Sequence, residues 1–584
     1  MQWFDKLTIR RNTIIGGAIF IVTFAIYIFT MCPTIYWEDS AAFSAVNSIL
    51  GIPHPPGFPI YVLLGRGFSL LPIENHAFRS NLMSAFWGCV SLMILYLLML
   101  QLFKEIKSCD DAFGRGLSPT RKKWISQMGM VVGVLFFAFS SAFWLQTIRA
   151  EVYTLNLFLT LLLIFLLIKW SQKKDANFSF KILILFSFVL GLSFTNHPLL
   201  VIALLPTFLV FLFIHSFRWG RGLTPAPTGE LKKIIILLAF FILGISLYLF
   251  LPIRSQLSPA INWGRPDSVA NLFSYITRSS QSTSVAASSV VPYLSRFWFT
   301  LSFPVIQFSL PLFWLGVLGA YSMFKKSRRL FMFTFLLFIF NLFTATWATD
   351  FSLRNYDLLG YLLPSLSIFA IWFAMGIFFF TESILKVGRV SRRRRDTRQN
   401  QCQVALPLKR DRKPTYIFKV SFCGLILSLP IFQIARNFDQ CNKRSTSWAY
   451  QYADRILNSV KKNALILVGD DNTLTTLWYL NYAEKKRPDV KIVSRSAFTQ
   501  KSHRDQLQKQ YKQVSLPKIE LGNPQNITYD FCRLNLDKMP VYCQYYTNDT
   551  IFAHHLSPAG YLFEYHPKRV ALSDSDIKMQ KEKG

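Results

Sequence analysis

Long apolar runs fill the first three quarters of the chain, and polar residues collect in the segments between them. A helix that crosses the roughly 30 Å hydrocarbon layer of a bilayer needs about 17 to 25 such residues. Eleven runs of this kind predict transmembrane helices at approximately 13–31, 81–103, 124–145, 153–169, 181–197, 199–217, 233–252, 298–322, 330–348, 360–381 and 415–434. The pattern therefore predicts a mainly α polytopic membrane protein with about eleven transmembrane helices.

The pattern changes after Ile434, where apolar and polar residues mix as in a soluble domain. Helical spacing at 447–460 and 473–485 alternates with apolar runs at 464–468 and 490–494 that are typical of buried strands. This alternation indicates an α/β fold. We therefore predict two domains, a transmembrane domain over 1–434 and a soluble α/β domain over 435–584.

Composition adds a strong positive charge to this picture. The chain has 584 residues, 52% of them hydrophobic, and a formal net charge of +33. In a soluble protein such a charge would suggest nucleic acid as a partner. Here it follows the loops, because 32 lysines and arginines lie in alternate loops on one side and only eight in the loops of the other side.

By the positive-inside rule, the cation-rich side is cytoplasmic, with the lipid bilayer and not nucleic acid as the partner. The N-terminus is then cytoplasmic and the C-terminal domain extracytoplasmic. We expect a bacterial inner membrane, with the endoplasmic-reticulum membrane as the alternative.

The eight cations of the predicted outer loops are all arginine: Arg66, Arg79, Arg149, Arg254, Arg265, Arg278, Arg296 and Arg354. The planar guanidinium binds phosphate bidentately and keeps its charge when partly desolvated, which suits an anionic lipid headgroup. The alternative is that these arginines pair with nearby carboxylates. Both interpretations stay open on the sequence.

Ionisable residues are missing from the middle of every predicted span, which argues against an ion-coupled transporter, since proton and sodium relays place carboxylates near the membrane centre. The chain also lacks nucleotide-binding glycine patterns and zinc-ligand spacings, so we expect no bound cofactor and name no metal ligand, while a metal requirement stays open on the sequence. Gly469-Asp470-Asp471, which follows the first predicted strand, is interpreted as a turn and helix cap, with metal or sugar binding as the alternative.

The segment that follows the first predicted span concentrates unusual residues at the membrane surface. Residues 36–59 read YWEDSAAFSAVNSILGIPHPPGFP, and include Glu38, Asp39 and His54. Carboxylates beside a span carry a desolvation cost, and consecutive prolines fix an extended backbone. This is the candidate reactive segment, and a polar loop with a rigid turn is the alternative.

The outer segments resemble a family of polytopic membrane proteins, the domain-of-unknown-function 2723 family, which includes an endoplasmic-reticulum O-mannosyltransferase of plexin-type immunoglobulin-like domains and many bacterial relatives. The matching stretches are Asp39-Ser40 with His54-Pro55-Pro56-Gly57-Phe58-Pro59, Ala77-Phe78-Arg79-Ser80-Asn81, Ala150-Glu151-Val152-Tyr153-Thr154-Leu155-Asn156, Gly191-Leu192-Ser193 with Asn196-His197-Pro198, Ile261-Asn262-Trp263-Gly264-Arg265-Pro266, Asp350-Phe351-Ser352-Leu353-Arg354 and the stretch from Asn463 to Val493. The spaced Asp39 and His-Pro-Pro-Gly pair is the most specific match.

One position departs from the family. Its usual pattern Asp-Ser-Gly-Glu is Asp39-Ser40-Ala41-Ala42 here, so the second carboxylate is missing. Glu38 is adjacent but precedes Asp39, and it need not point to the same place. Asp39 is thus left as the main catalytic candidate.

The resemblance implies a glycosyltransferase of the membrane-embedded C superfamily. Such an enzyme would move a sugar, here expected to be mannose, from a polyprenyl phosphate to a protein or glycan hydroxyl, with Ser or Thr of a protein favoured, on the extracytoplasmic face. Asp39 would act as general base, and Arg254, Arg278 and Arg354 would stabilise the leaving phosphate. A single base without an enzyme nucleophile predicts inversion at the sugar carbon.

Glu38, beside Asp39, is a candidate substrate contact. Five further residues are candidate substrate contacts, each with a structural alternative. His54 would bind phosphate or acceptor, or brace the loop, and Glu151 would assist Asp39 or pair with Arg149. The others are His197, with a turn in the link before Pro198 as its structural alternative, and Asn262 and Trp263, which would contact a sugar or anchor the chain at the interface. The competing functions are a transporter or flippase of lipid-linked saccharide and a non-catalytic membrane scaffold.

Overall fold

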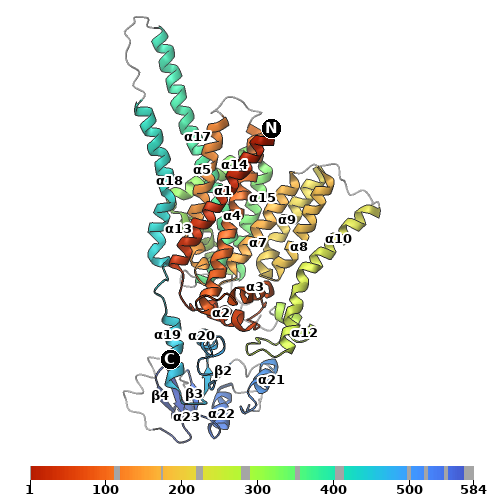
Figure 1. The fold of residues 1–584 in the computed structure, drawn as a ribbon, viewed down its shortest axis with the longest axis vertical. Coiled ribbons are helices and arrows are strands. Elements are labelled where there is room, and N and C mark those ends of the chain that lie inside the picture. The colour runs from red at the N-terminus through yellow and green to blue at the C-terminus, as the bar shows by residue number, and fades with distance from the viewer. Residues whose placement is uncertain are drawn as a thin grey trace.

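The structure is a computed structural model of the chain, and it describes residues 2–110, 119–172, 175–218, 228–277, 290–348, 356–401, 413–495, 501–517, 524–544 and 550–570. A bundle of long helices makes up most of the molecule (Figure 1). The short helices α2 and α3 lie between this bundle and the C-terminal domain, and the N-terminus lies at the opposite end (Figure 1). The start of α1 and the C-terminal domain, which the charge pattern assigns to opposite sides, thus lie at opposite ends of the bundle. The assignment of one end to the cytoplasm stays a prediction.

The long helices are α1 (Gln2–Thr30), α4 (His76–Asp110), α5 (Pro119–Ala138), α7 (Tyr153–Ser171), α8 (Ala176–Phe194), α9 (Pro198–Arg218), α10 (Thr228–Ile245), α13 (Val290–Phe308), α14 (Leu310–Lys326), α15 (Arg328–Ala348), α17 (Leu363–Gln401) and α18 (Lys413–Cys441). Within the described ranges, eight helical segments are long and apolar enough to cross a membrane, or up to ten spans if each of two bent pairs counts as one. These ten correspond to ten of the eleven predicted spans. The eleventh, 415–434, falls in α18.

Two predicted spans are broken by their own sequence. The span predicted at 298–322 is not one helix, because α13 and α14 meet at 106°. Ser309 has φ 64 between them, in the left-handed region, and a proline follows at the start of α14. The span predicted at 124–145 bends by 66° between α5 and the short α6 (Ser141–Thr147).

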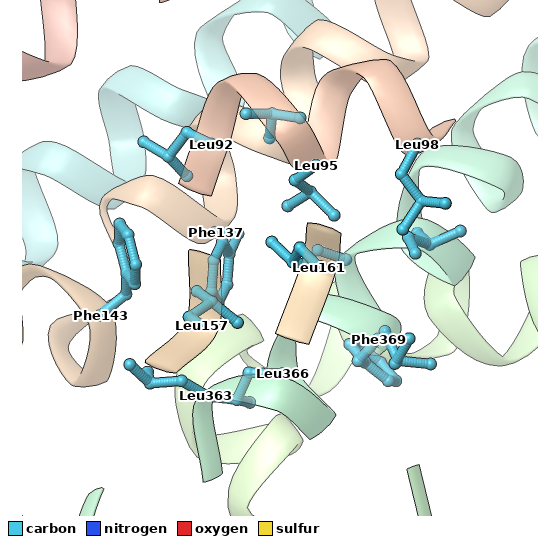
Figure 2. Close-up of a cluster of buried hydrophobic side chains, with 14 of the residues drawn as sticks. Leu92, Leu95, Leu98, Phe137, Phe143, Leu157, Leu161, Leu363, Leu366 and Phe369 are labelled. Atoms are coloured by element: carbon cyan, nitrogen blue, oxygen red, sulfur yellow. The ribbon is translucent and has the colours of Figure 1, made fainter. Parts of the chain in front are cut away.

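The core of the bundle is made of leucine and phenylalanine side chains that interdigitate between α4, α5, α7 and α17 (Figure 2). Along the span Gly360–Ile384, which contains most of α17, 94% of the most apolar window is buried, against 17% for the span Leu231–Gln256. The first is therefore central and the second peripheral. Contact between α14 and α17 depends on Gly319 and Gly376, because a Cβ at either position would collide with the backbone of the other helix.

Short elements cover the end of the bundle that carries α2 (Asp39–Ile49). They are α3 (Pro59–Ser69), η2 (Ser246–Leu249), α11 (Phe250–Gln256), α12 (Val269–Thr277), α16 (Tyr356–Leu359) and η3 (Gly360–Leu362). All α2 residues from Ser40 to Ser48 are buried, so this helix is enclosed by protein on all sides. A residue at its first turn is therefore held in a fixed position.

The C-terminal region has the α/β fold that the sequence predicted. Its elements are α19 (Trp448–Ser459), β1 (Leu465–Val468), α20 (Asp471–Trp478) with the π-helical turn η4 (Tyr479–Ala483), β2 (Lys491–Ser494), α21 (Lys501–Gln510), α22 (Pro524–Leu536), β3 (Val541–Cys543), α23 (Thr550–Ala553), β4 (Leu556–Ala559) and β5 (Leu562–Tyr565). The strand order is β2-β1-β3-β5-β4, with β2, β1 and β3 parallel and β5 antiparallel to its neighbours. The division at residue 434 stays a prediction, and α18 continues past it to Cys441.

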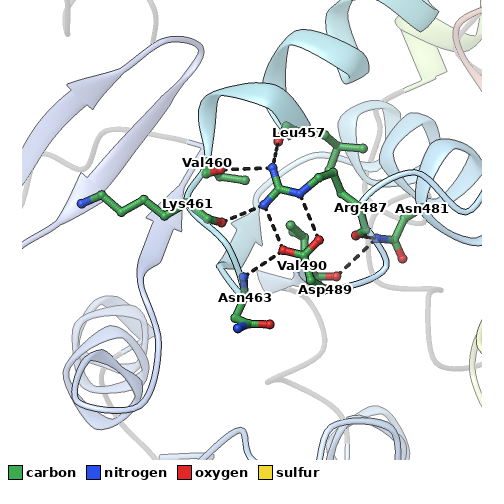
Figure 3. Close-up of polar contacts among 8 residues, drawn as sticks. All are labelled: Leu457, Val460, Lys461, Asn463, Asn481, Arg487, Asp489 and Val490. Atoms are coloured by element: carbon green, nitrogen blue, oxygen red, sulfur yellow. Dashed lines mark hydrogen bonds and ion pairs between the residues drawn. The ribbon is translucent and has the colours of Figure 1, made fainter.

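A polar cluster around Arg487 ties α19 to the loop before β2 (Figure 3). The guanidinium donates to the carbonyl oxygens of Leu457, Val460 and Lys461, and it forms an ion pair with Asp489 at 3.0 Å from Nε to Oδ1. Hydrogen bonding from Arg487 lowers the pKa of Asp489 to about 2. The cluster therefore stabilises the packing of α19 against the segment before β2 within the domain.

The C-terminal domain shares a hydrophobic core with the outer helices. Ala45 and Val46 of α2 belong to the same buried cluster as Leu474 and Leu477 of α20. The hydroxyl of Tyr479 also accepts a hydrogen bond from the backbone N–H of Ala77 at 3.1 Å. Since apolar burial and hydrogen bonds join the two parts, the start of α20 has a fixed position relative to α2.

Candidate functional site

A cavity of about 600 Å³ lies between the C-terminal domain and the end of the bundle that carries α2. Its walls come from five parts of the molecule: the start of α2, the loop before α3, the turns at this end of the bundle, the segment between α11 and α12, and the start of α20. The lining residues are Trp37, Glu38, Asp39, Ala42, His54, Pro55, Phe58, Val152, Tyr153, His197, Trp263, Leu358, Tyr361, Asp471, Asn472 and Thr475. Five of the ten residues that the sequence nominated thus face one space: Glu38, Asp39, His54, His197 and Trp263.

Asp39 is the first residue of α2, and its side chain opens into this cavity with 40% relative exposure. The N-terminus of a helix stabilises a negative charge, which favours the carboxylate form. His54 Nε2 lies 3.7 Å from Asp39 Oδ2. This is ion-pair distance for a protonated imidazole, and it is longer than a hydrogen bond.

The His-Pro-Pro-Gly loop fixes His54 through a tight turn. Gly57 has φ +91, and its N–H donates to the carbonyl oxygen of His54 at 3.0 Å. A Cβ at Gly57 would lie 2.8 Å from Leu251 and 2.9 Å from Tyr275, so both the backbone angle and the space require glycine. The imidazole packs against aromatic rings, with Phe58 at 5.2 Å between centroids.

Glu38 is held by a buried cation. Arg149 is 2% exposed and lies between two carboxylates, with Nη1 at 2.9 Å from Glu38 Oε2 and Nη2 at 3.8 Å from Glu151 Oε1. Glu151 is fully buried and is not among the residues that line the cavity. The structure therefore favours the ion-pair interpretation of Glu151, and its contact with substrate stays a prediction without a geometric basis.

His197 belongs to an aromatic wall of the cavity. Its ring lies 5.1 Å from that of Tyr361 and 6.0 Å from that of Tyr153. Gly360 allows this approach, since a Cβ there would collide with the ring of Tyr153. We did not predict either tyrosine as a site residue, although Tyr153 lies within a matching stretch, because aromatic residues at span ends are common interfacial anchors.

The Asn262-Trp263 stretch enters the site through a backbone pairing with the loop before His54. Ile52 donates its N–H to Ile261 at 2.8 Å and accepts from Trp263 at 3.1 Å. This pairing places the Trp263 ring 6.1 Å from His54. Asn262 does not line the cavity, and its amide bonds Ser255 at 3.1 and 3.3 Å.

The predicted phosphate-binding arginines have different outcomes. Arg254 donates to the carbonyl oxygens of Leu50 and Ile49 at 2.7 and 3.2 Å, so it binds the C-terminal end of α2. A cation is favourable at that end of a helix. Arg278 and Arg354 lie outside the described residues.

The start of α20 forms a wall of the cavity, a segment for which the sequence favours a turn and helix cap over ligand binding. Asp470 caps α20, as interpreted, by accepting from the Thr473 N–H at 2.9 Å. Asp471 and Asn472 instead face the cavity, and Asn472 Oδ1 accepts a hydrogen bond from the Glu38 N–H at 3.1 Å. The signal in the sequence was two aspartates after a buried strand, where capping the helix requires only one.

The arrangement is suited to proton transfer and to binding of a hydroxylated substrate. A carboxylate and an imidazole face each other across an open space, with aromatic rings beside them that sugars can stack on. In the part of the chain that the structure describes, no three His, Cys, Asp or Glu side chains gather as a metal site.

Two family models match this chain, one over a range that contains Asp39 and one over a range that contains Asp471. The family model described as "Protein O-mannosyl-transferase TMEM260 N-terminal domain" matches residues 39–220, and "TMEM260-associated domain 2" matches residues 449–531. The chain is similar to the TMEM260 family in both regions. The family resemblance inferred from the motifs is thus confirmed.

Individual proteins of the TMEM260 family support this similarity. The Protein O-mannosyl-transferase TMEM260 of Mus musculus is 24% identical over 497 residues, which cover 82% of this chain and 62% of the relative. Protein O-mannosyl-transferase tmem260 of Dictyostelium discoideum is 24% identical over 509 residues, covering 82% and 56%. The chain therefore spans about three fifths of the length of these curated relatives.

A solved structure shows the same fold for the TMEM260-like chain. The crystal structure of ArnT from Cupriavidus metallidurans, bound to undecaprenyl phosphate, superimposes with a TM-score of 0.54 at 11% identity. The match covers 96% of this chain and 99% of ArnT. The predicted glycosyltransferase-like membrane fold is thus confirmed, and at this identity the likeness concerns the fold alone.

Proposed function

We propose that the chain is a membrane glycosyltransferase that moves a sugar, mannose in the first instance, from a polyprenyl phosphate to a protein hydroxyl of Ser or Thr. The observation that carries the proposal is the carboxylate of Asp39, which opens from a buried helix into a cavity of about 600 Å³. This cavity lies at the predicted extracytoplasmic end of an ArnT-like bundle. The O-mannosyltransferase relatives and the undecaprenyl phosphate bound to ArnT support the choice of acceptor and donor.

In the proposed reaction, Asp39 takes the proton of the acceptor hydroxyl as its oxygen attacks the anomeric carbon of the sugar. The bond from that carbon to the phosphate oxygen breaks, and polyprenyl phosphate leaves with both electrons. Because attack and departure occur on opposite faces, the configuration at the anomeric carbon is inverted.

The remaining cavity residues would bind and orient the substrates. We assign a hydrogen bond to a substrate oxygen to His54, and sugar stacking to Trp263 and the tyrosine wall. Neutralisation of the leaving phosphate is assigned to Arg278 and Arg354, on the charge of their side chains and their place in predicted outer loops. Arg254 supports α2 instead.

The test is transfer by the purified full chain in lipid nanodiscs, with radiolabelled mannosyl phosphoryl polyprenol as donor. Secreted proteins from a deletion strain of the source organism serve as acceptors. Label should pass to protein, and Asp39→Asn should lower the rate by at least about 100-fold, the usual contribution of a general base. Asp454→Asn, which breaks a partly exposed ion pair with Lys486 outside the cavity lining, is the matched control and should keep the full rate.

Other outcomes would replace the proposal. An unchanged rate in Asp39→Asn would mean that another group is the base. Movement of intact lipid-linked sugar across the bilayer without transfer would favour the flippase. If the protein shows neither activity, the non-catalytic scaffold is the remaining function.

A further inference from the structure

We propose that the C-terminal domain completes the transfer site by supplying its second carboxylate, Asp471, which binds the acceptor opposite Asp39. The inference rests on the proposed function and names a residue for that reaction. Asp471 comes from a different domain than Asp39 and lies 432 positions further along the chain. Both side chains nevertheless line one cavity.

The position of Asp471 follows from the fold of the domain. The carboxyl ends of parallel strands are where open α/β sheets bind ligands. β1 ends at Val468, and the chain turns at once into α20, so the first turn of α20 projects from this edge of the sheet. The same turn meets the start of α2, where Asn472 Oδ1 accepts from the Glu38 N–H at 3.1 Å.

The two adjacent aspartates of this turn, Asp470 and Asp471, have different contacts. Asp470 is committed to the protein, because it accepts from the Thr473 N–H and from the Gln544 side chain. The carboxylate of Asp471 accepts no hydrogen bond from any residue that the structure describes, and it opens into the cavity. A carboxylate kept in a cavity without a protein donor is suited to accept one from a ligand.

The electrostatic surroundings agree with such a role. Burial raises the pKa of Asp471. The nearby His54 lowers this pKa again in part, and the charge of Asp470 raises it further. Hydrogen bonds from substrate hydroxyls or peptide N–H groups would replace the hydration that this carboxylate loses on burial. Because α20 belongs to the C-terminal domain and not to the membrane helices, we assign Asp471 to the acceptor and not to the membrane-bound donor.

Ala42 makes the inference sharper. It lies one helical turn after Asp39 and lines the same cavity as Asp471. A glutamate introduced at this position would enter the cavity that Asp471 lines, so it can test whether a carboxylate from α2 takes over the role of Asp471.

The experiment measures transfer kinetics in the nanodisc assay, with the secreted-protein acceptor titrated at saturating donor. Asp471→Asn should raise the acceptor KM at least 10-fold and leave the donor KM within twofold of the wild-type value. Asp471→Glu should restore most of the acceptor affinity, whereas Asp471→Gln, equal in size but uncharged, should not. Ala42→Glu in the Asp471→Asn background should lower the acceptor KM again, and Asp454→Asn is the control that should match wild type.

Folding is checked by size-exclusion profile and thermal midpoint. If Asp471→Asn is not monodisperse, the acceptor KM values of Asp471→Glu and Asp471→Gln are compared instead, because these two side chains have the same size and differ in charge. Suppose that the wild type is active. An acceptor KM that is unchanged in Asp471→Asn, or equal in Asp471→Gln and Asp471→Glu, would then overturn the inference and leave the proposed function standing. Wild type without transfer would instead overturn the proposed function.

Discussion

The two walls of the cavity are built in different ways. The membrane-side wall carries Asp39 and His54, which lie within one short segment and are held by a buried helix and a proline-rich turn. The domain-side wall carries Asp471 and Asn472 on the first turn of α20, and it depends on docking against α2. The first wall is a local motif, whereas the second exists only where two folded parts meet.

This difference teaches where each wall is vulnerable. A change at the membrane-side wall disturbs a residue in its own loop, whereas a change at the docking surface separates the two carboxylates without touching either. Trp263 belongs to both, since its ring lies 6.1 Å from His54 and 5.6 Å from Trp478. The following changes test the comparison, beginning with the largest expected effect.

Removing the buried cation should break the membrane-side wall completely. Arg149→Ala leaves Glu38 and Glu151 close together without their shared partner, which costs about 3 to 5 kcal/mol for a broken buried pair. We expect the full chain to accumulate poorly and to lose its monodisperse profile in detergent. Accumulation and thermal stability equal to wild type would show that the pair is not buried as described.

Separating the domain-side wall should remove activity and keep both parts folded. Leu477→Asp places a charge in the core shared by α2 and α20, where the leucine side chain is fully buried. Transfer should fall below detection, while proteolysis of the segment between α18 and α19 should become faster. Leu534→Asp is the control on an exposed surface of the same domain, and it should resist proteolysis like wild type.

A smaller disturbance of the membrane-side wall comes from the turn itself. Gly57→Ala forces a Cβ into contact with Leu251 and Tyr275 at a positive φ, at a cost of about 1 to 3 kcal/mol. His54 should shift, so that transfer falls by roughly 10-fold, the factor that corresponds to about 1.4 kcal/mol, while the fold is kept. Gly67→Ala in α3, where nothing lies within 4 Å of the new Cβ, should leave transfer unchanged.

The smallest effect is expected from the partly exposed ion pair of the C-terminal domain, whose partners are 25% and 30% exposed. Asp489 has its pKa lowered from 3.8 to about 2 in the folded state, so it stabilises the fold above pH 3.8, and this contribution disappears as the pH falls through about 2. Asp489→Asn should cost about 1 kcal/mol at neutral pH. The stability difference from wild type should vanish near pH 2, as followed by thermal melting of the full chain. A difference that grows on acidification would contradict the assignment.

Much of the fold could be predicted because its signals are local. Apolar length marked ten membrane spans, and spacing marked α19, β1, α20 and β2 within a few residues. The bend between α13 and α14 was missed because apolar composition continues across Ser309, and only the backbone turn there ends the first helix. Hydropathy measures burial in lipid and carries no information on direction.

Part of the cavity lining could also be predicted from local signals. Asp39, His54, His197 and Trp263 were found because motif spacing and resemblance marked them, and they face one cavity. Arg254 and Glu151 carried the same signals, yet their charges are used to hold α2 and Arg149. Residue type cannot distinguish a charge used by the ligand from a charge used by the protein.

The sequence by itself determined a polytopic helical protein and the α/β domain, and it predicted the sidedness and the candidate reactive segment around Asp39. Periodicity and motif spacing carry that information because each arises from residues close together in the chain. Only the tertiary structure decided that Asp471, and not its neighbour Asp470, faces the same cavity as Asp39. That outcome depends on packing α20 against α2 across more than 400 residues, and no local pattern records such a contact.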